Sequence, residues 1–294
     1  AVAYDKLGKQ DLAIELMEKK ETIKPGLYET AANHGTFHAH AGRFEEALPY
    51  LKRAIEINPD AHFGREKYQI LLIEYSLSQP VDQTFAEYLQ EHLQGISDEE
   101  KKAAIKGVLG IIRFGNHDNP KVLAALGSLL TFDRGERPDV DAKALAARAY
   151  LKASYLTKDE KKSDQLREQA RRAIAWQEGA KIEQLEAEFR RELDDANKWY
   201  DELRHRELKW VAAGVDVDAE FAKLYAEEPA AIQTRSDGNL THDGHQRRGA
   251  QRIMGSLIGG TVAIVATVIG LLYVAVRRLR PTTFESFKKP MSGG

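Results

Sequence analysis

Residues 28–61 read YETAANHGTFHAHAGRFEEALPYLKRAIEINPDA, and this stretch decides how the chain folds. Small residues stand at fixed places in it: Gly35, Gly42, Ala47 and Ala54. Small side chains at these places let two helices approach closely, and Asn58-Pro59 ends the second of them. The stretch therefore predicts a helical hairpin that turns at Gly42.

The same pattern occurs once more upstream. Four residues recur 34 positions later, and the pairs are Gly8 and Gly42, Ala13 and Ala47, Met17 and Leu51, Pro25 and Pro59. A period of this length indicates stacked helical hairpins. The pattern resembles the tetratricopeptide repeat (TPR) family, and the resemblance covers residues 1 to about 77. In this register Ala1 stands at the eighth position of a repeat, so we expect more chain upstream.

Beyond residue 77 the helices are predicted from apolar stripes at helical spacing. Leu126-Gly127, followed by Ala146, Tyr150 and Ala153, is TPR-like and indicates a degenerate repeat, and an unrelated α-hairpin is the alternative. A longer stripe from residue 158 to residue 213 predicts one or two amphipathic helices with a break at Gly179. These helices either cap the repeats or pair as a coiled coil, and we favour the cap.

One segment near the end contains no charge. Residues 254–276 read MGSLIGGTVAIVATVIGLLYVAV, which is 23 residues long. At about 1.5 Å per residue, a helix of this length crosses a hydrocarbon core of about 30 Å. The segment therefore predicts contact with a lipid bilayer. A face of small residues is predicted to pack against another membrane helix, and it consists of Gly255, Gly259, Ala263 and Thr267.

The predicted fold class is all-α: a TPR-like helical-hairpin solenoid, then long amphipathic helices and one C-terminal transmembrane helix. The predicted parts are TPR repeats at 1–77 (the first one truncated), degenerate TPR-like repeats at 78–157, long charged amphipathic helices at 158–226, a juxtamembrane linker at 227–253, the transmembrane helix at 254–276 and a basic polar tail at 277–294.

Basic residues on the two sides of residues 254–276 indicate how the predicted transmembrane helix is oriented. Five follow it in the tail, and three precede it: Arg247, Arg248 and Arg252. Positive charge favours the cytoplasmic side. We therefore expect a bacterial inner-membrane protein whose repeats are periplasmic and whose C-terminus is cytoplasmic. The competing arrangement is a tail anchor with cytosolic repeats.

The composition excludes several kinds of chemistry. The 43 Lys and Arg residues nearly balance 45 Asp and Glu, so we expect no nucleic-acid partner. The chain has no cysteine, which excludes disulfides and thiolate metal sites. It also has no phosphate-binding GxxxxGK[ST] and no GxSxG nucleophile motif. We expect no enzyme, no cofactor and no small-molecule substrate.

One histidine cluster could bind a metal. His34 and His38 are four residues apart and share a helix face, and His40 follows. In the TPR register the first two occupy packing positions between helices, and no carboxylate has the spacing of a third ligand. The favoured interpretation is a pair of core histidines, with zinc or haem binding as the weaker alternative.

The resemblance also implies a partner-binding surface. TPR proteins hold a peptide or a helix in a concave groove lined by the first helix of each hairpin. Carried over by position, this groove contains Asn33, Thr36, His40, Phe63, Glu66, Lys67, Ile70 and Glu74. Only Asn33 and Lys67 fit the carboxylate-binding places that some members have.

Together these features predict a non-enzymatic TPR scaffold or interaction subunit of a membrane protein complex. The expected partners are the other protein subunits of that complex. The alternative is a tail-anchored TPR receptor that captures soluble client proteins for targeting or organelle fission.

Overall fold

The computed structural model describes residues 1–59, 61–78, 83–115, 117–132, 140–175 and 179–227. Throughout these ranges the secondary structure is helical, without a strand, so the all-α class is confirmed. The chain divides into two compact units, Ala1–Glu186 and Ala187–Gly294, which are described separately.

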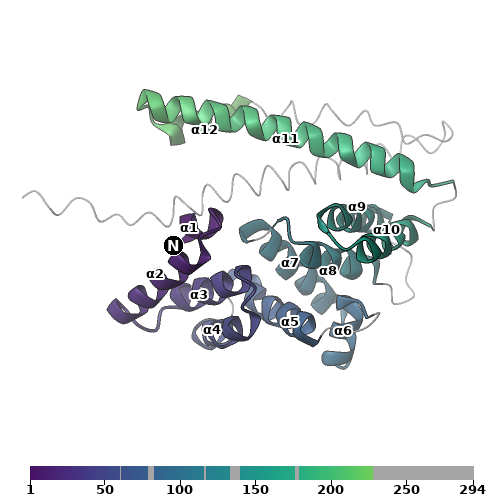
Figure 1. Ribbon diagram of the computed structural model, residues 1–294, viewed down its shortest axis with the longest axis horizontal. Helices are drawn as coiled ribbons and strands as arrows, with labels where there is room; N and C mark the ends of the chain where they lie inside the picture. The colour runs from purple at the N-terminus through teal and green to yellow at the C-terminus, as the bar shows by residue number, and fades with distance from the viewer. Residues whose placement is uncertain (60, 79–82, 116, 133–139, 176–178, 228–294) are drawn as a thin grey trace, which may run out of the picture. The chain divides into compact units, whose positions relative to one another are not determined.

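The first unit is a succession of helices that pack on their neighbours in sequence (Figure 1). They are α1 (Val2–Lys6), α2 (Gln10–Ile23), α3 (Tyr28–His40), α4 (Phe44–Ile57), the 3-10 helix η1 (Ala61–Gly64), α5 (Arg65–Ser78), α6 (Phe85–His92), α7 (Asp98–Phe114), α8 (Pro120–Thr131), α9 (Val140–Leu156) and α10 (Glu160–Ile174). Helix α11 (Ile182–Ala213) starts in this unit and continues into the second, which also contains α12 (Val217–Glu227).

The 34-residue period appears as two hairpins, α1–α2 and α3–α4. Each turns at a glycine whose φ is positive, 71° at Gly8 and 76° at Gly42, a conformation that residues with a Cβ rarely adopt. Ala13 and Ala47, at the same place in the second helix of each hairpin, are both fully buried.

Gly35 lets α3 and α4 touch. A Cβ atom at this position would lie 2.6 Å from Leu51 Cγ and 3.0 Å from the backbone oxygen of Ala47. Both atoms belong to α4, so the two helices are in contact over the missing side chain. The small residues of segment 28–61 therefore serve the close approach that their spacing predicts.

Helix α5 is buried on two sides. Ile70 and Ile73 pack with Ala47 and Leu51 of α4. Tyr68 and Leu72 belong to the main apolar cluster, together with residues of α6, α7 and α8. At Gly107 of α7, a Cβ atom would lie 2.4 Å from the Tyr68 ring, so α7 lies directly against α5.

Polar side chains define where the middle helices begin. Thr84 and Glu87 form a capping box at α6, and Ser97 and Glu100 form another at α7. Asn119 caps α8, whose first residue is Pro120. These caps set the starts of α7 at Asp98 and of α8 at Pro120.

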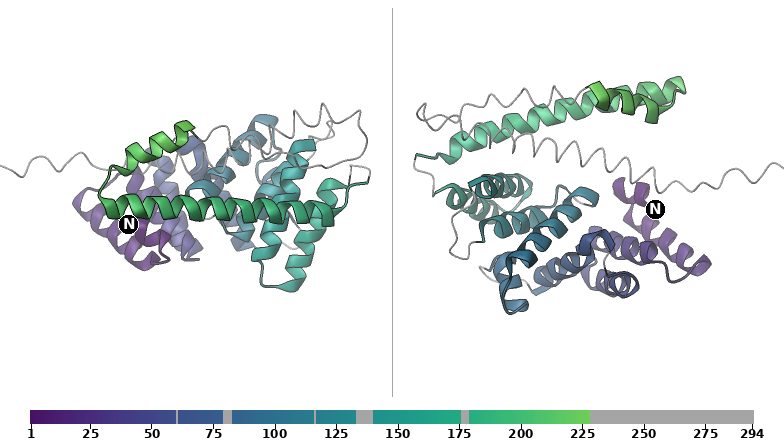
Figure 2. Two further views of the ribbon diagram at one scale, coloured as in Figure 1. Left: turned by 90° about the horizontal axis from the view of Figure 1, so that it is seen from above. Right: turned by 180° about the vertical axis from the view of Figure 1, so that it is seen from behind.

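Helices α8 and α9 form a close pair. A Cβ atom at Gly127 would lie 2.8 Å from the ring of Tyr150, and Ala146 and Ala153 are fully buried. In the rear view of Figure 2, the helices of the first unit pass from α1 in purple to α10 in teal, and α8 and α9 lie towards the teal end. Whether 78–157 consists of degenerate TPR units stays a prediction.

The break predicted at Gly179 is confirmed, because α10 ends at Ile174 and Gly179 has a φ of 77°. Across this break, Arg167 donates two hydrogen bonds to Glu186, at 2.8 and 2.5 Å. The hydroxyl of Tyr155 donates a third, at 3.1 Å. Helix α10 packs on α9, and the choice between cap and coiled coil for residues 158–226 stays a prediction.

In the second unit α12 folds back on α11. The ring of Phe221 meets Trp210 edge to face, with centroids 5.2 Å apart. The turn between them contains Gly214, whose φ is 68°, and Asp216, whose carboxylate accepts hydrogen bonds from the backbone of Asp218 and Ala219.

The predicted membrane segment, its small-residue face and the basic tail lie outside the described residues, as does nearly all of the predicted linker. Within the described part of the chain, no helix is both long and apolar enough to cross a bilayer.

Candidate functional site

The candidate site is the face formed by α1, α3 and α5, the first helices of three successive hairpins. Helices α1 and α3 are in contact. The amide of Gln69 on α5 lies 3.4 Å from the hydroxyl of Thr36 on α3, which continues the row. We call this row of three helices the inner face, because the TPR resemblance assigns partner binding to the first helices.

Three of the predicted groove residues lie on α3. Asn33 and Thr36 are half-buried, and Thr36 accepts the hydrogen bond from Gln69. His40 is held by α1: its Nδ1 lies 2.9 and 3.0 Å from the two carboxylate oxygens of Asp5. All three lie on α3, and their contact with a partner stays a prediction.

The predicted groove residues of α5 are divided between surface and interior. Lys67 is exposed, and Glu74 pairs with Lys52 at 3.4 Å. In contrast, Glu66 is 2% exposed and Ile70 is 7% exposed, so these two side chains are interior rather than part of an open groove. The side chain of Phe63 lies outside the described residues.

Glu66 belongs to a buried polar network. Arg65 donates a hydrogen bond to its carboxylate at 2.7 Å. Burial raises the pKa of the Tyr28 hydroxyl far above its usual value, and the charge of Glu66 and a hydrogen bond to it add to the rise. Tyr28 therefore stays protonated as a donor, which gives the buried carboxylate partners from both α3 and α5.

His34 and His38 lie in the interior of the α3–α4 hairpin. Their rings stack with centroids 5.1 Å apart, and the ring of Tyr50 stacks on His34 at 3.8 Å. His38 Nδ1 lies 3.2 Å from the carboxylate of Glu46. Among the described residues, no three His, Asp or Glu side chains are placed to hold a metal ion together. The two rings thus pack on each other and on Tyr50 inside the hairpin.

These two histidines predict a pH dependence of stability. Burial lowers the pKa of both rings below the ordinary 6.5, against the raising effect of nearby Glu18, Glu21 and Glu46, and His38 lowers that of His34 further. The folded chain thus binds fewer protons than the unfolded chain. The contribution of these histidines to the free energy of unfolding should be fully present above about pH 6.5. As the pH falls below about 6.5 the free energy of unfolding should decrease, by at most about 1.4 kcal/mol per pH unit for each histidine, until the pKa of the folded state is reached.

Urea unfolding at pH 7.5 and pH 5.5 measures this loss. The double substitution His34→Phe and His38→Phe keeps the stacked rings and should flatten the pH dependence. His117→Gln is the matched control, because that side chain is 69% exposed. An unchanged pH dependence in the double variant would show that His34 and His38 do not cause the loss of stability.

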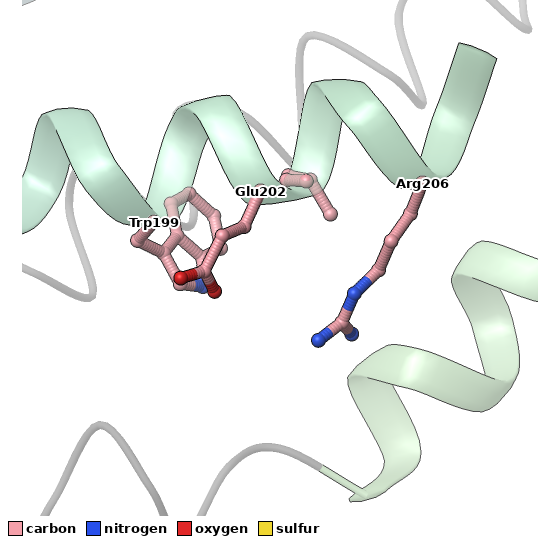
Figure 3. Close-up of a pocket in the computed structure, with 4 residues that line it drawn as sticks. Trp199, Glu202 and Arg206 are labelled. Atoms are coloured by element: carbon pink, nitrogen blue, oxygen red, sulfur yellow. The ribbon is translucent and has the colours of Figure 1, made fainter. Parts of the chain in front are cut away.

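The second unit has a hollow on the surface of α11. It is lined by Trp199, Glu202, Leu203 and Arg206 of α11. Figure 3 shows Trp199, Glu202 and Arg206 projecting from α11 towards the same space. All four residues come from two turns of one helix, so the hollow is a feature of that helix surface.

Sequence reasoning missed the contacts that Asp5, Lys6 and Gly115 make at the inner face. Lys6 Nζ donates to the backbone oxygen of Gly115 at 2.8 Å, across 109 positions of sequence. No local pattern carries such a signal, because the pairing depends on where α7 comes to lie.

Comparison with known families places a tetratricopeptide repeat at residues 28–61. This is the hairpin α3–α4, which contains Gly35 and three of the predicted groove residues. No curated protein matches the chain, and no solved structure matches it. The sequence therefore contains a TPR repeat in a chain whose described secondary structure is all helical, and such a repeat suggests a protein–protein interaction scaffold.

Proposed function

We propose that this chain is a non-enzymatic scaffold subunit of a membrane protein complex. The observation that carries the proposal is the TPR repeat at residues 28–61, built as a close-packed hairpin with its first helix on the inner face. Repeats of this kind generally bind protein partners. The inner face displays polar side chains at Asn33, Thr36 and Lys67, which suit a protein segment.

The membrane part of the proposal rests on the sequence of residues 254–276. An uncharged stretch of 23 residues with arginines on both sides has the length and flanks of a bilayer-spanning helix. The excess of basic residues after it favours a cytoplasmic C-terminus and periplasmic repeats at a bacterial inner membrane. Gly255, Gly259, Ala263 and Thr267 give this helix a small-residue face for packing against a partner helix.

Charge reversal on the inner face tests partner binding. Lys67 is exposed, so Lys67→Glu should leave the fold intact while it changes the charge that a partner meets. We expect the amount of partner protein recovered with the purified chain to fall about tenfold, the equivalent of about 1.4 kcal/mol.

Lys161→Glu is the matched control, because Lys161 is equally classed as exposed but belongs to α10, away from the inner face. Equal loss in both variants would show that only the net charge matters. Full recovery with Lys67→Glu would remove the inner face as the binding surface.

A further inference from the structure

The carboxyl end of α7 touches the first helix of each of three hairpins. Lys6 of α1 donates to the backbone oxygens of Phe114 at 3.3 Å and of Gly115 at 2.8 Å. Gly115 lies against His40 of α3, since a Cβ atom there would be 2.9 Å from His40 Nε2. The guanidinium of Arg65 on α5 lies over the ring of Phe114, 5.6 Å from its centroid.

Asp5 fixes His40 in this arrangement. The Asp5 side chain is 5% exposed and faces Nδ1 of the imidazole with both oxygens. A buried carboxylate needs such a partner. Because Nδ1 is held by Asp5, Nε2 on the opposite side of the ring points to Gly115. Lys6, Asp5 and His40 together form what we call the clasp.

The clasp satisfies groups that a helix end leaves open. The last carbonyl oxygens of a helix have no partner within the helix. Lys6 donates hydrogen bonds to two such oxygens, those of Phe114 and Gly115. The guanidinium of Arg65 makes a cation–π contact with the ring of Phe114. The contacts come from α1, α3 and α5 in turn, so the end of α7 lies against all three helices of the inner face. In Figure 1 one end of α7 lies beside α1.

We propose that the carboxyl end of α7 is a built-in occupant of the inner face, and that a protein partner gains this face by opening the clasp. This inference rests on the proposed function and adds its regulation. Lys6 is exposed, so water competes for its two hydrogen bonds, and each contributes little net stability. The apparent affinity for a partner then scales with the fraction of molecules whose clasp is open.

Locking the clasp tests the proposal. The chain has no cysteine, so Lys6→Cys and Phe114→Cys place a single reactive pair in the full-length protein. A bifunctional thiol reagent with a cleavable spacer joins the two residues and can later be cut. We expect the locked protein to recover at least about tenfold less partner from its own membranes than the same protein after cleavage.

Lys6→Ala provides the opposite change. We expect partner recovery to rise several-fold, together with faster amide hydrogen exchange in α1 and at the end of α7. Lys9→Ala, also an exposed lysine, should change neither quantity. Single-cysteine variants treated with the reagent control for modification alone.

The outcomes separate the two proposals. Equal recovery from locked and cleaved protein overturns the regulation while the scaffold function stands. Absence of any recovered partner in every form, with exchange still responsive to Lys6→Ala, overturns the scaffold function and the regulation with it, and leaves the clasp as a structural brace.

Discussion

Replacing Gly35 with valine should lower the free energy of unfolding of the first unit by about 3 kcal/mol, the upper part of the range for overpacked cores. A Cβ atom at this position meets Leu51 Cγ at 2.6 Å and the backbone oxygen of Ala47 at 3.0 Å. The backbone contact cannot rotate away, so α3 and α4 must separate. Thermal and urea unfolding of the full-length protein, followed by circular dichroism, measures the change.

Gly110→Val is the matched control. Gly110 is also a glycine inside a helix, but its nearest neighbour is the Cδ of Arg65 at 3.3 Å. A flexible side chain can move aside, so we expect a change within about 1 kcal/mol, the size of helix-propensity effects. Equal destabilisation by both substitutions would show that the loss reflects valine in a helix rather than contact between α3 and α4.

On the proposed membrane anchoring, two lysines in the apolar segment should keep the protein out of the membrane fraction. Ile264→Lys with Val268→Lys places two charges near the middle of residues 254–276. Each opposes insertion by about 2.5 to 3.5 kcal/mol. We expect the wild-type chain to stay in membranes washed at alkaline pH and the variant to appear in the supernatant.

The control for this experiment is Ile264→Leu with Val268→Leu, which keeps the segment apolar and should keep the chain in the membrane fraction. A lysine variant that stays with washed membranes would show that residues 254–276 are not what anchors the protein.

The hairpins could be predicted from sequence because their determinants are local. Gly35, Ala47 and Pro59 lie within one repeat, and helix contact, turn and helix end all depend on neighbours fewer than 30 positions away. The same holds for the capped starts of α7 and α8. Such features depend on residue size and backbone conformation, which a single sequence displays.

The TPR register placed Glu66 and Ile70 in the groove, whereas both side chains are buried in the structure. The TPR register places these residues as though the third repeat began with one continuous α-helix. In the structure η1 comes first, Gly64 has a φ of 71°, and α5 begins at Arg65. A 3-10 turn has about 3.0 residues per turn instead of 3.6, so the phase of the following helix is shifted. Ile70 consequently packs on α4.

The clasp could not be predicted for a different reason. Lys6 and Gly115 are far apart in sequence, and their contact requires α7 to lie against α5 through Gly107 and Tyr68. A glycine inside an amphipathic helix does not say which aromatic ring it will meet. Long-range packing of this kind is decided by the whole unit.

The most direct test of the central claim is purification of the full-length protein from its own membranes in mild detergent, followed by mass spectrometry of the subunits and their ratios. The scaffold account predicts a stable, stoichiometric set of membrane proteins. Recovery of the chain alone, or with only substoichiometric soluble proteins, would contradict it and favour a receptor that captures clients transiently.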